Sequence, residues 1–225
     1  HKEDNYVDFN RQKLLPYQLS DRGPATAIGH INNDGKNDIF FGGSKFVPSR
    51  IFVQTDSLYV EKTIPEIQKD SIKEDVTAAI ADFTGNGKAD LFLGSGGGDF
   101  YNKMAPLLDS YYVRNDSVFE KASLPEYFEN ASVIKVNDFD SDGDLDIFVG
   151  NQAVTNDFGQ TPNSYLLKNT NGKFTIEKNE ELQNTGMITD ALWEDVNGDG
   201  SEDLIIIGEW MSPRFFINNN GVLVE

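Results

Sequence analysis

Short apolar runs and short acidic loops alternate along the whole chain. An apolar stretch rich in small residues precedes each acidic loop, and a second apolar run that ends at a glycine follows it. The second runs are residues 39–41, 91–93, 147–149 and 204–207. Apolar runs of this length, bounded by turn-forming residues, predict strands that are buried on both faces. Two more apolar stretches complete each unit, so the pattern predicts four strands per repeat.

The unit occurs four times. The acidic loops read HINNDGKND, DFTGNGKAD, DFDSDGDLD and DVNGDGSED, and they begin at residues 30, 82, 138 and 195. A period of about 55 residues with four strands per unit is typical of β-propeller blades. We therefore expect an all-β fold, a single β-propeller domain or fragment. Its four-stranded antiparallel blades are predicted at about residues 24–63, 75–123, 131–178 and 188–225.

The strands at which the repeats begin and end in this sequence leave two ways to complete the propeller. Residues 5–9 are predicted as a fourth strand with no first three before it, and the chain ends within the fourth strand of the last repeat. This arrangement favours an arc of a larger propeller, whose uncovered terminal blades would drive self-association. In the alternative, residues 5–9 pair with the last repeat and close a four-bladed ring.

Composition narrows the classes of function. The 225 residues include 19 Lys and Arg against 37 Asp and Glu, a net charge of −18 that would repel a nucleic acid. With no cysteine and two histidines, a disulfide framework, a zinc ribbon and a thiol nucleophile are excluded, and a His-dependent triad is nearly so. The longest apolar run, residues 204–207, is far too short to span a membrane.

The acidic loops have the donor pattern of a calcium site. Oxygen-bearing side chains recur at positions 1, 3, 5 and 9, a glycine occupies position 6, and the backbone carbonyl of position 7 is a further candidate. Calcium accepts six to eight oxygens in irregular geometry, whereas magnesium requires a tight octahedron. An EF-hand is excluded because position 12 is apolar in all four loops. A single such loop could also be a metal-free hairpin turn. A turn explains the Asp-Gly or Asn-Gly pair at positions 5 and 6, but it does not explain the acids at positions 1 and 9.

The loops differ in their number of carboxylates, the main determinant of affinity. We expect up to four Ca²⁺ sites, the third and fourth loops being strongest and the first weakest, because His30 replaces its first acid. The candidate ligands are Asp138, Asp140, Asp142, Asp144 and Asp146 in the third loop, Asp195, Asn197, Asp199, Ser201 and Asp203 in the fourth, Asp82, Thr84, Asn86, Lys88 and Asp90 in the second, and Asn32, Asp34, Lys36 and Asp38 in the first.

Each unit consists of a strand, an acidic loop and a second strand that ends at a glycine, and residues 41–44 read Phe-Gly-Gly-Ser. This unit resembles the FG-GAP/VCBS repeats of integrin α-like β-propellers. Residues 138–150, 186–193 and 208–211 resemble more narrowly exported proteins that combine these repeats with an ASPIC/UnbV domain. The resemblance implies a calcium-bearing, extracytoplasmic protein, whether secreted, cell-surface or periplasmic. It implies no established enzymatic activity.

Two classes of function remain. Two long loops between second and third strands, residues 95–108 and 151–162, would lie on the face opposite the acidic loops. Their candidate contacts for a protein or glycan are Asp99, Phe100, Tyr101, Asn102, Asn151, Gln152, Asn156, Asp157 and Phe158. The favoured hypothesis is a non-catalytic binding or scaffolding module with structural calcium. The alternative is a calcium-assisted polysaccharide lyase or glycosidase, although no pair of acids stands out as catalytic.

Overall fold

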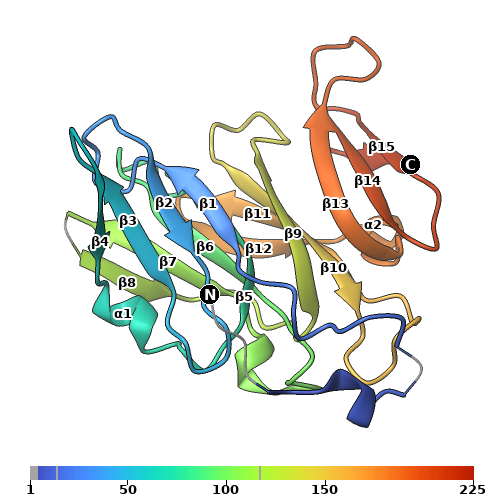
Figure 1. Cartoon of the computed structure of the whole chain (residues 1–225). Coiled ribbons are helices and arrows are strands. Elements are labelled where there is room, and N and C mark those ends of the chain that lie inside the picture. The colour runs from blue at the N-terminus through green and yellow to red at the C-terminus, as the bar shows by residue number, and fades with distance from the viewer. Residues whose placement is uncertain (1–4, 14, 117) are drawn as a thin grey trace.

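Four antiparallel sheets of four strands each build the protein (Figure 1), in a computed structural model that describes residues 5–13, 15–116 and 118–225. The strands of each sheet are neighbours in chain order. The sheets contain, in turn, β1 (Thr26–Gly29), β2 (Asp38–Phe41), β3 (Arg50–Gln54) and β4 (Tyr59–Lys62); β5 (Asp75–Ala81), β6 (Asp90–Ser95), β7 (Ser110–Asn115) and β8 (Val118–Ala122); β9 (Asn130–Asn137), β10 (Asp146–Ala153), β11 (Tyr165–Thr170) and β12 (Lys173–Glu177); and β13 (Met187–Glu194), β14 (Asp203–Glu209), β15 (Arg214–Asn218) and β16 (Leu223–Val224). The predicted all-β architecture of four-stranded blades is confirmed.

Helical turns are few in the described residues and lie outside the sheets. They are the 3₁₀ turns η1 (Asp8–Asn10) and η2 (Ala105–Leu107) and the short helices α1 (Pro65–Gln68) and α2 (Glu180–Gln183). In the part of the chain that the structure describes, no helix is long and apolar enough to cross a membrane.

Each pair of neighbouring sheets encloses its own hydrophobic core. Phe40 and Ile51 of the first sheet meet Leu91 and Tyr112 of the second. A second core, rich in aromatic rings, lies between the second and third sheets, and a third core lies between the third and fourth. Side chains alternate between the faces of a strand, so a sheet between two cores needs apolar residues at consecutive positions. This explains why every residue of β6 and β10 is buried.

The first and last sheets are covered on one face only. In β2 and β14 the burial varies along the strand, because one side of each strand has no neighbouring sheet. The prediction that all four second strands are buried on both faces is therefore correct for the two central sheets and wrong for the two terminal ones. The sheets form an open arc, with the first and the last at opposite ends (Figure 1).

The strand predicted at residues 5–9 does not form. Residues 8–10 make the turn η1, in which the buried Asp8 accepts hydrogen bonds from the backbone N–H and the hydroxyl of Ser20. The last sheet contains only β13 to β16, so the closed four-bladed ring is wrong for the described residues. Residues 5–13 and 15–22 instead lie across the face that carries the loops between second and third strands. There Arg11 donates to the carbonyl of Gly98 at 3.3 Å, and Tyr17 bonds to Glu209.

Candidate functional site

The four acidic loops connect the first strand of each sheet to the second, and they lie on one face of the arc with the turns between third and fourth strands. Their position-1 acids have the same local role wherever they occur. Asp138 accepts the backbone N–H groups of Asp142 and Gly143, both at 3.0 Å. Asp82 and Asp195 accept the N–H groups at the same two loop positions. A position-1 carboxylate thus closes its own loop.

The position-9 acids connect each loop to the third strand of its sheet. One oxygen of Asp203 accepts the N–H of Val196 at 3.1 Å, and the other accepts the N–H of Asn218 at 2.8 Å. Equivalent pairs of bonds hold the position-9 acids of the other loops, Asp38, Asp90 and Asp146, and all four acids are almost wholly buried. The sequence alone indicated no role for the acids at positions 1 and 9 in a loop without metal. That interpretation is wrong, because the acids at both positions accept hydrogen bonds from backbone N–H groups.

The third loop alone among the described residues gathers three acidic groups with metal-ligand spacing. Ligand atoms of Asp138, Asp140 and Asp146 lie within 4.8 Å of one another. Oδ1 of Asp140 is buried and has no hydrogen-bond donor. Burial, assisted by the nearby charges of Asp140 and Asp142, raises the pKa of Asp146 to about 7. Carboxylate oxygens held this close together, with Asp146 buried, form an environment that a hard cation stabilises.

The other predicted ligands of the third loop lie at its rim. Asp142 accepts the N–H of Asp144 at 3.0 Å, a bond that holds the pKa of Asp142 below its usual value. Asp144 accepts the N–H of Asn171 at 2.8 Å. The Lys168 amine contacts Asp140 and lies 3.3 Å from Asp142, so it partly neutralises the cluster.

The fourth and second loops use their polar groups more locally. The amide of Asn197 donates to Asp199 at 2.8 Å, and Asp199 in turn accepts the N–H of Ser201 at 2.8 Å. In the second loop, Asn86 accepts the N–H of Lys88, whose amine pairs with Asp116 at 2.6 Å. Thr84 Oγ1 lies 3.3 Å from Asp90 and 3.4 Å from Asp82. The predicted ligands of both loops thus lie together, but without a third carboxylate at close range.

The first loop departs from the others at His30. Its Nδ1 lies 2.9 Å from the carbonyl oxygen of Lys36, so the imidazole N–H donates to the position-7 carbonyl. Asp34 accepts from the amide of Asn32 and from the N–H of Lys36, both at 2.9 Å. These bonds hold the loop without a cation.

The face opposite the acidic loops, which carries the loops between second and third strands, exposes fewer of the predicted contact residues than the sequence indicated. Asp99, Phe100, Asn151 and Gln152 are buried, so the prediction that they offer a free ligand-binding surface is wrong. Gln152, for example, donates to the hydroxyl of Tyr17 in the segment that crosses this face. The remaining candidates Tyr101, Asn102, Asn156 and Asp157 are exposed, and Phe158 is half-buried.

Trp210 is the most exposed large hydrophobic residue on the opposite face. Its side chain is 75 % exposed, its backbone φ is +57°, and its ring contacts Phe158 edge-on at 5.6 Å. The other tryptophan, Trp193, is buried in the core between the third and fourth sheets. Trp210 therefore joins the exposed loop residues as a candidate ligand contact.

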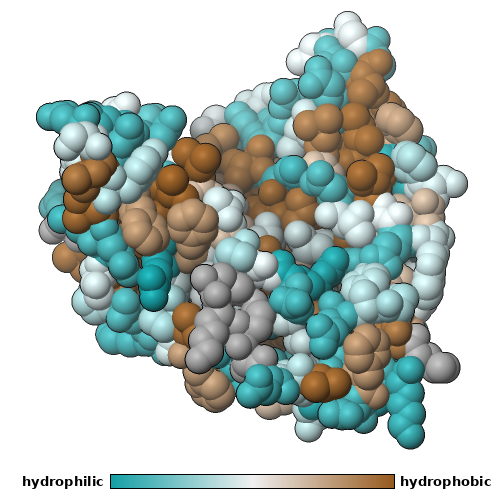
Figure 2. Space-filling model, in the orientation of Figure 1, coloured by the Kyte–Doolittle hydropathy of each residue, from teal (hydrophilic) through white to brown (hydrophobic). Residues whose placement is uncertain are grey.

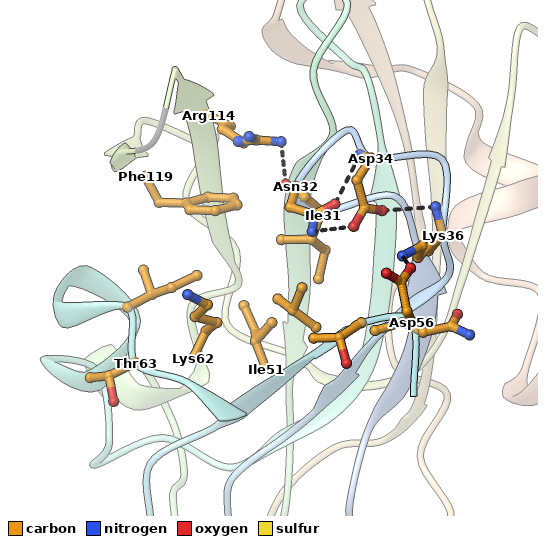
Figure 3. A pocket seen from close by; sticks show the side chains of 14 residues that line it. Ile31, Asn32, Asp34, Lys36, Ile51, Asp56, Lys62, Thr63, Arg114 and Phe119 are labelled. Atoms are coloured by element: carbon orange, nitrogen blue, oxygen red, sulfur yellow. Dashed lines mark hydrogen bonds and ion pairs between the residues drawn. The ribbon is translucent and has the colours of Figure 1, made fainter. Parts of the chain in front are cut away.

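A pocket on the acidic-loop face lies between the first and second sheets (Figure 3), and sequence reasoning missed it. Its volume is about 560 Å³, and its walls come from the first acidic loop, β3, the segment after β4, and the third and fourth strands of the second sheet. Apart from the first acidic loop, no motif marks these residues, because they belong to two repeats and meet only where neighbouring blades pack.

Comparisons with known proteins support the fold and the repeat. The FG-GAP-like repeat family matches residues 138–206, which contain the third and fourth acidic loops, and identifies this segment as an FG-GAP-like repeat. No curated protein matches the sequence. A solved structure with a similar fold is that of an Agrocybe aegerita lectin, described as the basis of specific recognition of non-reducing terminal N-acetylglucosamine. It is 19 % identical with a TM-score of 0.57, and the match covers 88 % of this chain and 50 % of the lectin. The chain thus spans half the length of that protein.

Proposed function

We propose that the chain is a calcium-stabilised propeller module that binds a glycan or a protein. The observation that carries the calcium part is the third-loop cluster, in which Oδ1 of Asp140 is buried without a donor beside Asp138 and Asp146. These residues fit a calcium ion, with Asp142 and the Asp144 carbonyl as further ligands. Calcium would neutralise the cluster and so stabilise the arrangement of loop and strand.

The binding part of the proposal rests on the FG-GAP-like repeat and on the fold shared with a lectin. We extend the resemblance to integrin α-like propellers and to exported ASPIC/UnbV proteins as part of the same proposal. An extracytoplasmic location agrees with it, because extracellular modules bind calcium with dissociation constants of about 0.1 to 1 mM. The exposed loop residues around Trp210 are one candidate contact surface.

Calcium titration followed by unfolding tests the metal. At 1 mM calcium and a dissociation constant of about 0.1 mM, each occupied site stabilises the fold by about 1.4 kcal/mol. We expect a chelator to lower the melting temperature, and Asp142→Ala to reduce the calcium response more than Asn32→Ala. A melting temperature that is the same with calcium and with chelator would exclude calcium sites under the conditions used.

A glycan array and a pull-down with the calcium-loaded chain test the binding function. Saturable binding without turnover supports the module. Cleavage of a polysaccharide by the chain would instead support the alternative, a calcium-assisted lyase or glycosidase.

A further inference from the structure

The pocket between the first and second sheets combines an apolar floor with two cationic side chains. Phe119 contributes an aromatic ring, and Ile31, Ile51 and Ile64 contribute aliphatic surface. In Figure 3 the amine of Lys62 and the guanidinium of Arg114 lie on opposite sides of the Phe119 ring. With a volume of about 560 Å³, the pocket is in the range that holds small ligands or one or two sugar residues.

Neither of these two cations, Arg114 and Lys62, forms an ion pair within the described part of the chain. Arg114 donates to the carbonyls of Ile31 and Asp116, and these bonds fix the guanidinium at the rim. Arg114 also donates to Oδ1 of Asn33, so Lys62 is the cation of this pocket that is available to an anion.

The other charged groups of the pocket are already satisfied. Lys36 pairs with Asp56, and Asp34 accepts hydrogen bonds from Asn32 and Lys36. In Figure 3 these groups lie on the side of the pocket away from Phe119 and Lys62. The pocket therefore has one side that attracts an anion and one acidic side that repels a second negative charge.

We propose that this pocket binds a uronic acid residue of an acidic glycan, an inference that rests on the proposed glycan-binding function. Lys62 binds the carboxylate, and the ring of Phe119 and the isoleucines contact the C–H face of the sugar. Gln54 and Thr63, which also line the pocket, offer an amide and a hydroxyl for the sugar hydroxyls. A single carboxylate matches the one amine of Lys62, whereas a polyphosphate would meet Asp34 and Asp56.

Isothermal titration of the whole chain with two matched ligands tests this proposal, at constant calcium. The first ligand is an oligosaccharide that ends in glucuronic acid, and the second is the same oligosaccharide ending in glucose. We expect the acidic ligand to bind at least tenfold more tightly, with a salt-dependent affinity. Lys62→Gln should weaken its binding about three- to tenfold, while Lys173→Gln, which changes an exposed lysine of the third sheet, should leave it unchanged.

Lys62 is the first choice for substitution because, unlike Arg114, it makes no backbone hydrogen bond that its loss would break. Equal affinity for both ligands would overturn the acidic selectivity but leave glycan binding intact. Acidic-ligand binding that survives both Lys62→Gln and Lys62→Glu would overturn the pocket as its site. Binding of an acidic peptide in place of the sugar, with the same dependence on Lys62, would overturn the glycan. If neither ligand binds and no glycan on an array binds, this inference and the glycan part of the proposed function both fail.

Discussion

One imidazole distinguishes the first acidic loop from the other three. His30 donates to the carbonyl of Lys36, which would otherwise face a cation in that loop. His30→Asp restores the acid at position 1 and frees this carbonyl. We expect the variant to bind one more calcium ion at millimolar concentration, measured as the stoichiometry of a calorimetric titration.

His30→Asn is the matched control for that gain. It frees the same carbonyl but adds no charge, so it should increase calcium binding less. An unchanged stoichiometry in His30→Asp would show that the imidazole is not what weakens this loop.

A buried carboxyl just before β7 makes stability depend on pH. Burial raises the pKa of Asp109 to about 6, although the N–H of Ser95 and the hydroxyl of Tyr127 both donate to it at 2.8 Å. Because this pKa lies above the unfolded value of about 3.9, folding favours the protonated form. The stabilisation is present below pH 4 and is lost as the pH rises through 6, a change on the order of 3 kcal/mol.

Asp109→Asn removes this titration and keeps a group of the same shape. Relative to the native chain, the variant should therefore become more stable between pH 4 and pH 7 by up to about 3 kcal/mol. Denaturant unfolding at the two pH values, with chelator present, measures the difference. Asp157→Asn, in an exposed loop, should show no such change. A difference for Asp109→Asn that is the same at both pH values would contradict the assignment.

At the scale of the elements, the acidic loop and the third strand form one unit. The sequence pattern predicts the loop correctly, but it shows only which residue types recur and not what each oxygen contacts. The position-9 acid bonds to a backbone N–H of a strand that lies some 15 to 24 residues further along the chain, as in Asp203 with Asn218 and Asp90 with Arg114. That partner follows from the strand register, which no nine-residue motif contains.

Two alanine variants separate this structural role from metal binding. Asp203→Ala leaves the N–H groups of Val196 and Asn218 without an acceptor, and each such loss costs about 1 to 3 kcal/mol. Among the described residues, the donor to Asp140 is the amine of Lys168, and Asp140→Ala removes this partly exposed contact, which is worth about 1 kcal/mol or less. In chelator, we expect Asp203→Ala to lower the free energy of unfolding by about 2 to 5 kcal/mol and Asp140→Ala to change it little.

With calcium present, we expect Asp140→Ala to have a large effect on stability, in contrast to its small effect in chelator. This variant should lose most of the calcium-dependent stabilisation, seen as a smaller shift of the denaturation midpoint on adding calcium. If the two variants are equally destabilised in chelator, the hydrogen bonds of Asp203 are not its main role.

The sequence predicts the blades of the whole molecule better than their boundaries. The strand periodicity and the repeat were sufficient to predict the four sheets, because all four strands of a blade lie within one repeat. Residues 5–9 show the same alternation as a strand, yet Asp8 is buried against Ser20 and the chain turns there. An alternating pattern cannot predict which partner edge is within reach, so the segment that crosses the opposite face could not be placed from the sequence.

The terminal sheets each leave an apolar face uncovered. Ile28 and Phe41 lie on the outer face of the first sheet, and Leu192, Ile207 and Phe215 lie on the outer face of the last. Ile28 is 62 % exposed and Leu192 is 53 % exposed. Figure 2 shows hydrophobic surface over β1 and β2 and over β13 and β14. Within the arc, the equivalent faces of neighbouring sheets pack against each other, so these two outer faces are suited to packing together between copies.

We therefore expect the chain to self-associate through its terminal sheets. Sedimentation equilibrium in moderate salt, which screens the charge of −18, should give a mass that rises above 25.1 kDa with concentration. Leu192→Glu places a charge on the outer face of the last sheet and should shift the chain toward the monomer. Val118→Glu, at an exposed position of the second sheet, serves as the control and should associate as the native chain does. A chain that stays monomeric at all concentrations, or a Leu192→Glu variant that associates as strongly as the control, would show that these faces do not pair.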